Sequence, residues 1–116
     1  LVLFEAPLFG IGGEGIPDYA RDLWHFPFHT TRDVAESLIT GRERLYVEHF
    51  FTEFAYNKGA FDSATVEEYA RLLARPGALR GGLEHYRAIE MSTEQIRTLA
   101  RHPLDIQVFG YGGSHS

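Results

Sequence analysis

The stretch LVLFEAPLFGIGGEGIPDY, residues 1–19, decides the fold class. It opens with an apolar run of strand length, LVLFEA (1–6), and a second such run, LDIQVFG (104–110), lies near the other end of the chain. Proline or glycine bounds each run, as is typical of strands in a mostly buried sheet. If the two strands are parallel neighbours, the residues between them form an unusually long crossover, of the kind produced when a helical lid is inserted into an α/β sheet.

The glycines at positions 10, 12 and 15 match the G-x-G-x-x-G pattern of dinucleotide-binding loops. In such a loop the strand runs almost directly into the first glycine, the helix starts within the motif, and a second strand follows. Here residues 5–9 intervene, the next helix begins only at Pro17, and residues 30–39 have helical spacing. We therefore expect a flexible glycine connector and no cofactor.

Composition narrows the classes of partner. The 116 residues are 44% hydrophobic and carry a net charge of −5, which suits one ordered domain and offers no basic surface for nucleic acid or an anionic membrane. No run approaches the ~20 apolar residues that span a bilayer, so we expect a soluble protein, with the cytoplasm slightly favoured. The chain has no cysteine and no initiator methionine, and both ends fall at strands. We expect a segment of a longer protein.

The residues between the strands have helical patterns. The clearest covers about 42–57, where Tyr46, Phe50 and Phe54 recur at the spacing of one helical face. A proline at position 27 is expected to break the helix that begins at Pro17. Another helix is expected over about 32–40, ending at Gly41, and a further one from about 62, with Val66, Tyr69, Leu72 and Leu73 facing inward. The next begins after Pro76 and runs through Leu83, Tyr86 and Ile89. The last begins at a capping box formed by Ser92 and Gln95 and ends before Pro103.

Three residues are candidates for chemistry on local grounds. Glu5 follows the first strand at the edge where open α/β sheets keep their sites, and is either a solvated acid or one that orients a histidine. His25 lies among aromatic residues, and Tyr86 lies on the inner stripe of its helix; each is a core residue or a donor to a pocket. His25 and His29 have the spacing of a zinc pair, but Pro27 is expected to separate them, and we predict no metal site.

Five motifs in order carry a resemblance: LFEAP (3–7), WHFPFH (24–29), ITGRERLYVEHFF (39–51), ARPGALRGGLEHYRA (74–88) and VFGYGG (108–113). Together they resemble the middle of an α/β-hydrolase of the epoxide hydrolase and haloacid dehalogenase group. The resemblance implies an α/β fold in which residues 1–7 are a core strand, 8–102 a helical cap, and 103–116 the next core strand and its loop.

In that family an aspartate attacks the epoxide or carbon–halogen bond, and water activated by a histidine hydrolyses the resulting ester. The resemblance gives Glu5 the role of orienting that histidine, and His25 and Tyr86 the role of binding the ring oxygen. Trp24, Phe26, Phe28 and Phe51 are expected to bind substrate. The aspartate and the histidine lie outside these 116 residues, so we expect the chain alone to be inactive and to need the rest of the hydrolase core.

Three alternatives for function stay open. An epoxide hydrolase-like enzyme would act on a small apolar epoxide. A haloacetate or haloalkane dehalogenase of the same fold would take a halogenated substrate, but Phe26 stands where such enzymes typically have a tryptophan donor to the halide. A non-catalytic helical module is the third alternative, because exposed strand edges would allow pairing with a second copy as a homo-oligomer.

Overall fold

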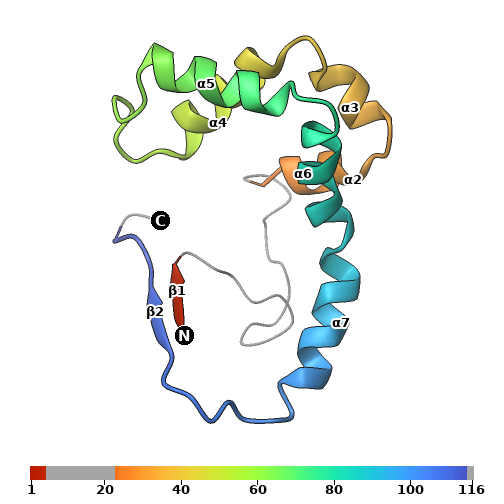
Figure 1. The fold of residues 1–116 in the computed structure, drawn as a ribbon, viewed down its shortest axis with the longest axis vertical. Helices are drawn as coiled ribbons and strands as arrows, with labels where there is room; N and C mark the ends of the chain where they lie inside the picture. The colour runs from red at the N-terminus through yellow and green to blue at the C-terminus, as the bar shows by residue number, and fades with distance from the viewer. Residues whose placement is uncertain (5–22, 115–116) are drawn as a thin grey trace.

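The computed structural model describes residues 1–4 and 23–114 (Figure 1). Glu5, the glycines at 10–15, the helix expected from Pro17 and His115 lie outside the described residues. The elements run in the order strand, six helices, strand within the described part of the chain. The expected architecture, mainly helical between two strands of an α/β sheet, is confirmed.

The two strands are short and parallel. β1 (Val2–Phe4) pairs with β2 (Phe109–Tyr111), with Val2 opposite Phe109 and Phe4 opposite Tyr111. They lie side by side in Figure 1, and the helices form the return path between them. The predicted crossover is therefore present, although the second strand begins later than the apolar run at 104 indicated.

The prediction of a mostly buried sheet is wrong for the strand residues described. Phe4 is 71% exposed and Tyr111 is 57% exposed, and their stacked rings have centroids 5.2 Å apart. Two strands cannot bury both of their faces without a neighbouring strand or a covering layer. The radius of gyration of 16.5 Å, against about 13 Å for a compact domain of this length, reflects the same open arrangement.

In the described part of the chain, six helices connect the strands. The helices α4 and α5 pack on each other, and α2 packs on α6 (Figure 1). A further helix, α7, continues from the end of α6. Their bounds are α2 (His25–Thr30), α3 (Val34–Ile39), α4 (Glu43–Phe54), α5 (Ser63–Leu73), α6 (Ala78–Arg87) and α7 (Ile89–Leu99).

Local sequence explains three of the helix ends. Gly41 follows α3 with φ of +80°, a left-handed conformation that glycine adopts without strain, as the predicted stop requires. Gly77 begins α6 with φ of +79°. Asp62 begins α5, because its side chain accepts a hydrogen bond of 2.7 Å from the backbone N–H of Thr65.

Two predictions about helix boundaries are wrong. Pro27 does not break a helix: it is the third residue of α2, where the amide that proline lacks would have no intrahelical partner. Ser92 does not cap a helix either, since α7 already begins at Ile89 and the N–H of Ser92 bonds to the carbonyl of Ala88 at 2.8 Å. Only Ala88 separates α6 from α7.

A small apolar core joins α3 to α6. Ala35, Ile39 and Leu83 are each at most 3% exposed and pack together. The half-buried side chains of Phe28, Tyr46, Leu73 and Leu79 surround them. This core holds the helices that carry the residues described below. No helix within residues 1–4 and 23–114 is long and apolar enough to cross a bilayer.

Candidate functional site

His25 opens α2 and is buried among aromatic rings, as its sequence neighbours predicted. It is 6% exposed. Its ring centroid lies 5.1 Å from that of Phe50, 5.4 Å from that of Phe54 and 5.8 Å from that of Tyr86. All three rings meet the imidazole edge to face, which fixes the plane of His25.

Tyr86 approaches His25 from α6. Its ring is half-buried and meets the rings of His25 and Phe26 almost at right angles, at 84° and 88°. Within the described residues the Tyr86 hydroxyl makes no hydrogen bond. The fold thus brings together two of the three predicted catalytic residues, from helices far apart in the sequence. Glu5, the third, lies outside the described residues.

The structure adds two residues that the sequence reasoning did not assign. His29 is 2% exposed, lies 4.2 Å from Tyr86 between ring centroids, and is hydrogen-bonded through Nε2 to the hydroxyl of Tyr46. Because Pro27 lies inside α2, His25 and His29 share a face, with ring centroids 5.4 Å apart. The separation predicted for them is therefore wrong. We call His25, His29, Tyr46 and Tyr86 the histidine–tyrosine cluster.

Burial sets the protonation of this cluster. It lowers the pKa of His25, and it lowers the pKa of His29 to about 4, with smaller contributions from the charges of His25 and Arg87. Burial also raises the pKa of both tyrosine hydroxyls. At neutral pH the cluster therefore holds neutral imidazoles and protonated phenols, which are hydrogen-bond donors in a low-dielectric surrounding.

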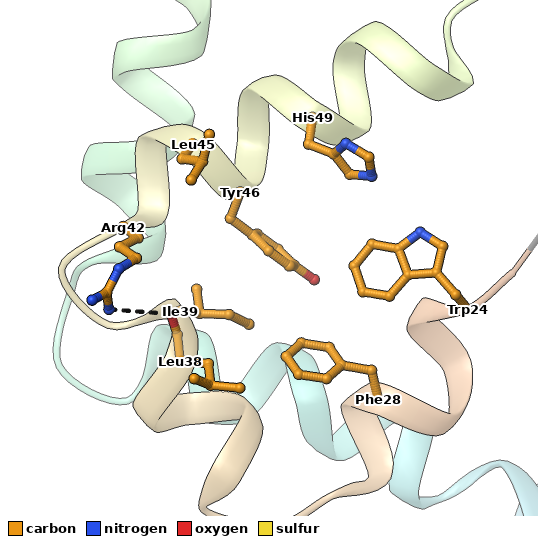
Figure 2. A pocket seen from close by; sticks show the side chains of 8 residues that line it. All are labelled: Trp24, Phe28, Leu38, Ile39, Arg42, Leu45, Tyr46 and His49. Carbon is orange, nitrogen blue, oxygen red and sulfur yellow. Dashed lines mark hydrogen bonds between the residues drawn. The ribbon is translucent and has the colours of Figure 1, made fainter.

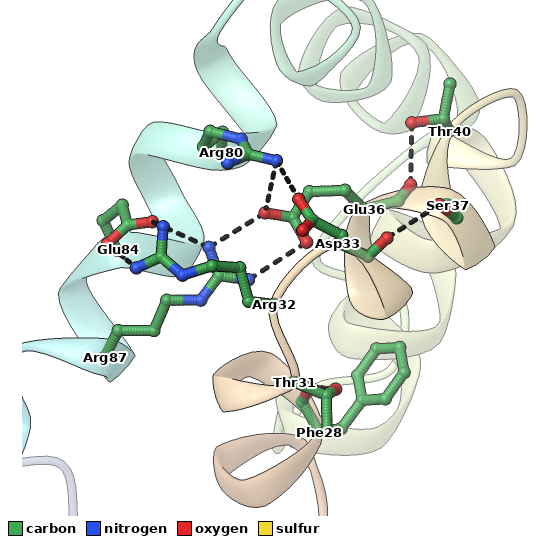
Figure 3. Close-up of polar contacts among 10 residues, drawn as sticks. All are labelled: Phe28, Thr31, Arg32, Asp33, Glu36, Ser37, Thr40, Arg80, Glu84 and Arg87. Carbon is green, nitrogen blue, oxygen red and sulfur yellow. Dashed lines mark hydrogen bonds and ion pairs between the residues drawn. The ribbon is translucent and has the colours of Figure 1, made fainter.

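A network of ion pairs fixes α6 against α3, next to Tyr86 (Figure 3). The Arg87 guanidinium donates to both carboxylate oxygens of Glu36, at 2.8 and 3.0 Å, and to Glu84 at 2.8 Å. The Arg87 and Glu36 side chains are 7% and 13% exposed. Arg80 contacts Glu36 at 3.6 Å, and Arg32 contacts Glu84 at 3.1 Å. These hydrogen bonds hold the side chain of Arg87, the residue after Tyr86, in one orientation.

Of the predicted substrate-binding residues, three lie beside the cluster. Trp24 has its ring centroid 6.1 Å from that of His25 and 5.7 Å from that of Phe28, and Phe26 lies 5.2 Å from Tyr86. Phe51 lies elsewhere. Its ring stacks on Phe61 at 4.0 Å and meets Tyr69 at 5.1 Å, in the contact between α4 and α5.

An open groove of about 390 Å³ lies between α2, α3 and α4 (Figure 2). Its lining is almost entirely apolar. The lining residues are Trp24, Phe28, Leu38, Ile39, Arg42, Leu45, Tyr46 and His49. Tyr46 therefore belongs to both the groove and the cluster, whereas His25 and Tyr86 do not line the groove.

The arrangement suits one kind of chemistry. Two neutral donors converge from α2 and α6 in an apolar surrounding, where a hydrogen bond to a developing negative charge is worth more than in water. Within residues 1–4 and 23–114, no three His, Cys, Asp or Glu side chains are grouped to hold a metal ion.

The chain is similar to two known proteins. The chain is 33% identical over 95 residues, 78% of its length, to a protein named soluble epoxide hydrolase from Corynebacterium sp. (strain C12). It is 38% identical to Cfl2 from Burkholderia cenocepacia, whose crystal structure matches it with a TM-score of 0.78 over 94% of this chain. The chain spans 33% of the first protein and 39% of the second. No family model matches it. These similarities support an α/β-hydrolase-like relationship.

Proposed function

We propose that this chain is the cap-bearing part of an epoxide hydrolase-like enzyme that opens a small apolar epoxide to a diol. In this proposal residues 1–7 and 103–116 belong to the core sheet, and residues 8–102 form the cap over the site. An aspartate elsewhere in the full-length protein attacks the epoxide carbon, the C–O bond breaks, and the ring oxygen takes up the electron pair. Water then hydrolyses the aspartyl ester.

The convergence of His25 and Tyr86 carries the proposal. A ring oxygen develops negative charge as the C–O bond breaks, and it needs donors already in place. The Tyr86 phenol, with its pKa raised by burial, stays protonated and donates. A neutral His25 donates as well when the ring nitrogen that faces the substrate carries its proton. The aromatic side chains of Trp24 and Phe26 exclude water from that oxygen.

Glu5 is assigned a supporting role. In this proposal it follows the strand that ends at Phe4 and orients the histidine that activates water. A carboxylate in that position holds an imidazole in the required tautomer and stabilises its protonated form. The aspartate and the histidine are expected in the rest of the full-length protein, which we therefore take as the partner of this chain.

Single-turnover kinetics on the full-length protein test the proposal. With styrene oxide as the probe, the wild type should form an ester whose mass is that of the enzyme plus the epoxide. His25→Phe and Tyr86→Phe should each slow ester formation by about a hundredfold, because each removes one donor to the ring oxygen. Tyr69→Phe is the matched control, since Tyr69 is 52% exposed and lies in the α4–α5 contact. Ester formation at the wild-type rate in both cluster variants would remove His25 and Tyr86 from the reaction.

Turnover of an epoxide and of haloacetate by the full-length protein tests the dehalogenase alternative. A departing halide needs a hydrogen-bond donor, and Phe26, which packs on Tyr86, offers none. We expect diol from epoxides and little halide from haloacetate. Halide release faster than diol formation would reverse the assignment while leaving the aspartyl ester in place.

A further inference from the structure

We infer that His29 and Tyr46 form a positioning pair that fixes the ring of Tyr86 for ring opening. This inference rests on the proposed function of Tyr86 as a donor to the epoxide oxygen. Neither His29 nor Tyr46 needs to touch the substrate: they act through the orientation of the Tyr86 ring.

The contact between His29 and Tyr86 is the closest ring contact within the histidine–tyrosine cluster. The two centroids are 4.2 Å apart and the planes meet at 70°, so one ring edge rests against the face of the other. The ring of Phe50 also stacks on that of His29, with the two centroids 6.2 Å apart. Rotation of the His29 ring would therefore remove the surface against which Tyr86 rests.

One hydrogen bond holds the His29 ring. Its Nε2 is bonded to the Tyr46 hydroxyl, while its Nδ1 is buried and has no partner in the described part of the chain. The Tyr46 hydroxyl is thus the polar contact that sets the plane of the imidazole. Tyr46 itself is held from α4, where its ring packs on Phe50 at 4.9 Å.

His29 is suited to this role because it stays neutral. Burial lowers its pKa to about 4, so its neutral form predominates at neutral pH. A charged imidazole buried among these rings would be costly without a partner of opposite charge. A neutral ring fixes geometry without that cost.

Small displacements of a donor reduce reaction rates strongly, because a shift of about 1 Å can cost a hundredfold. Loss of the Tyr46–His29 hydrogen bond frees the ring without removing it, so we expect a smaller loss, of about tenfold. The loss should fall on ring opening. Hydrolysis of the ester, which the cap donors do not drive, should keep its rate.

Three variants of the full-length protein test the inference: Tyr46→Phe, His29→Phe and the double variant, with Tyr69→Phe as the matched control. Each single variant should slow ester formation about tenfold and leave ester hydrolysis unchanged. The double variant should be no slower than either single variant, because both break the same hydrogen bond.

A second measurement needs no turnover. In the wild-type chain the His29 ring current should shift the NMR signals of the Tyr86 ring protons, and Tyr46→Phe should reduce that shift. Unchanged Tyr86 shifts in a folded Tyr46→Phe variant would overturn the inference, as would ester formation at the wild-type rate. Absence of any ester in the wild type would instead overturn the proposed function, and the NMR result would then decide the geometric part alone.

Discussion

Removal of the negative charge of Glu36 should destabilise the chain by an amount that depends on pH. Glu36→Gln keeps the shape of the side chain but breaks the paired hydrogen bonds to Arg87, at 2.8 and 3.0 Å. Orphaning a buried charge typically costs about 3–5 kcal/mol. Arg87 keeps Glu84 as a partner at 2.8 Å, so we expect Glu36→Gln to lower the free energy of unfolding by about 2 kcal/mol at pH 7. Urea denaturation followed by circular dichroism measures this loss.

The pH dependence gives a sharper test of the same pair. Hydrogen bonds from Arg87 lower the pKa of Glu36 from 4.5 to about 2. A carboxyl with a lowered folded-state pKa stabilises the fold above its unfolded pKa, and this contribution is lost as the pH falls from 4.5 through 2. About two fifths of the contribution should remain at pH 3. The difference between wild type and Glu36→Gln should therefore shrink to about 1 kcal/mol at pH 3.

Glu48→Gln, at an exposed position of α4, is the control for this substitution and should leave the free energy of unfolding within about 0.5 kcal/mol of wild type. Two results would refute the reasoning. One is a Glu36→Gln variant as stable as wild type at pH 7. The other is a stability difference that is equal at pH 7 and pH 3, since it would show that the carboxylate charge is not what joins α3 to α6.

Leu83→Ala should lower the free energy of unfolding by about 3 kcal/mol, because Leu83 is 3% exposed in the core between α3 and α6, whereas Leu45→Ala, at a side chain 67% exposed, should change it little. Equal denaturation midpoints for the two variants would argue against that core. The 116-residue chain should associate in sedimentation experiments as its concentration rises, because the strand pair exposes apolar side chains such as Phe4, and Phe4→Lys should weaken that association. A wild-type chain that stays monomeric at every concentration would contradict this.

The layout of the fold could be predicted because the determinants are local. Two apolar runs predicted the parallel strands, and Gly41 and Asp62 marked helix ends through backbone freedom and a side-chain cap. The stripe of Tyr46 and Phe50 predicted one face of α4, and these rings do lie together, 4.9 Å apart. Where one or two neighbouring residues determine the backbone, the pattern in the sequence was sufficient.

The wrong predictions concern residues whose conformation depends on their position in a helix or on packing, not on local sequence alone. Proline ends a helix from its interior, but Pro27 lies in the first turn of α2, where it is tolerated. Ser92 has the spacing of a capping box, but Ala88 keeps a helical conformation and lets α7 start earlier. Tyr69 was expected inward, yet it is 52% exposed, and the smaller Ala70 is buried in its place.

The roles of His29 and Tyr46 could not be predicted from the sequence. The sequence marks His29 only by its zinc-pair spacing with His25, and Tyr46 only by its place on one face of a helix. Their relation depends on a contact between α2 and α4, which no local spacing encodes. A useful indication was nonetheless present: a second histidine one turn after His25 shares its face of α2 once Pro27 is accepted in the first turn.

The parallel pairing of β1 and β2 has a consequence for how such a protein diversifies. Adjacent strands lie about 4.8 Å apart, so the chain leaves the sheet from one strand and rejoins it on its immediate neighbour. The backbone N–H of Phe109 donates to the carbonyl of Leu1 at 2.9 Å, which joins the two strands directly. Everything between them is one continuous insertion. A helical block attached in this way can change in length and sequence while the strands keep their register.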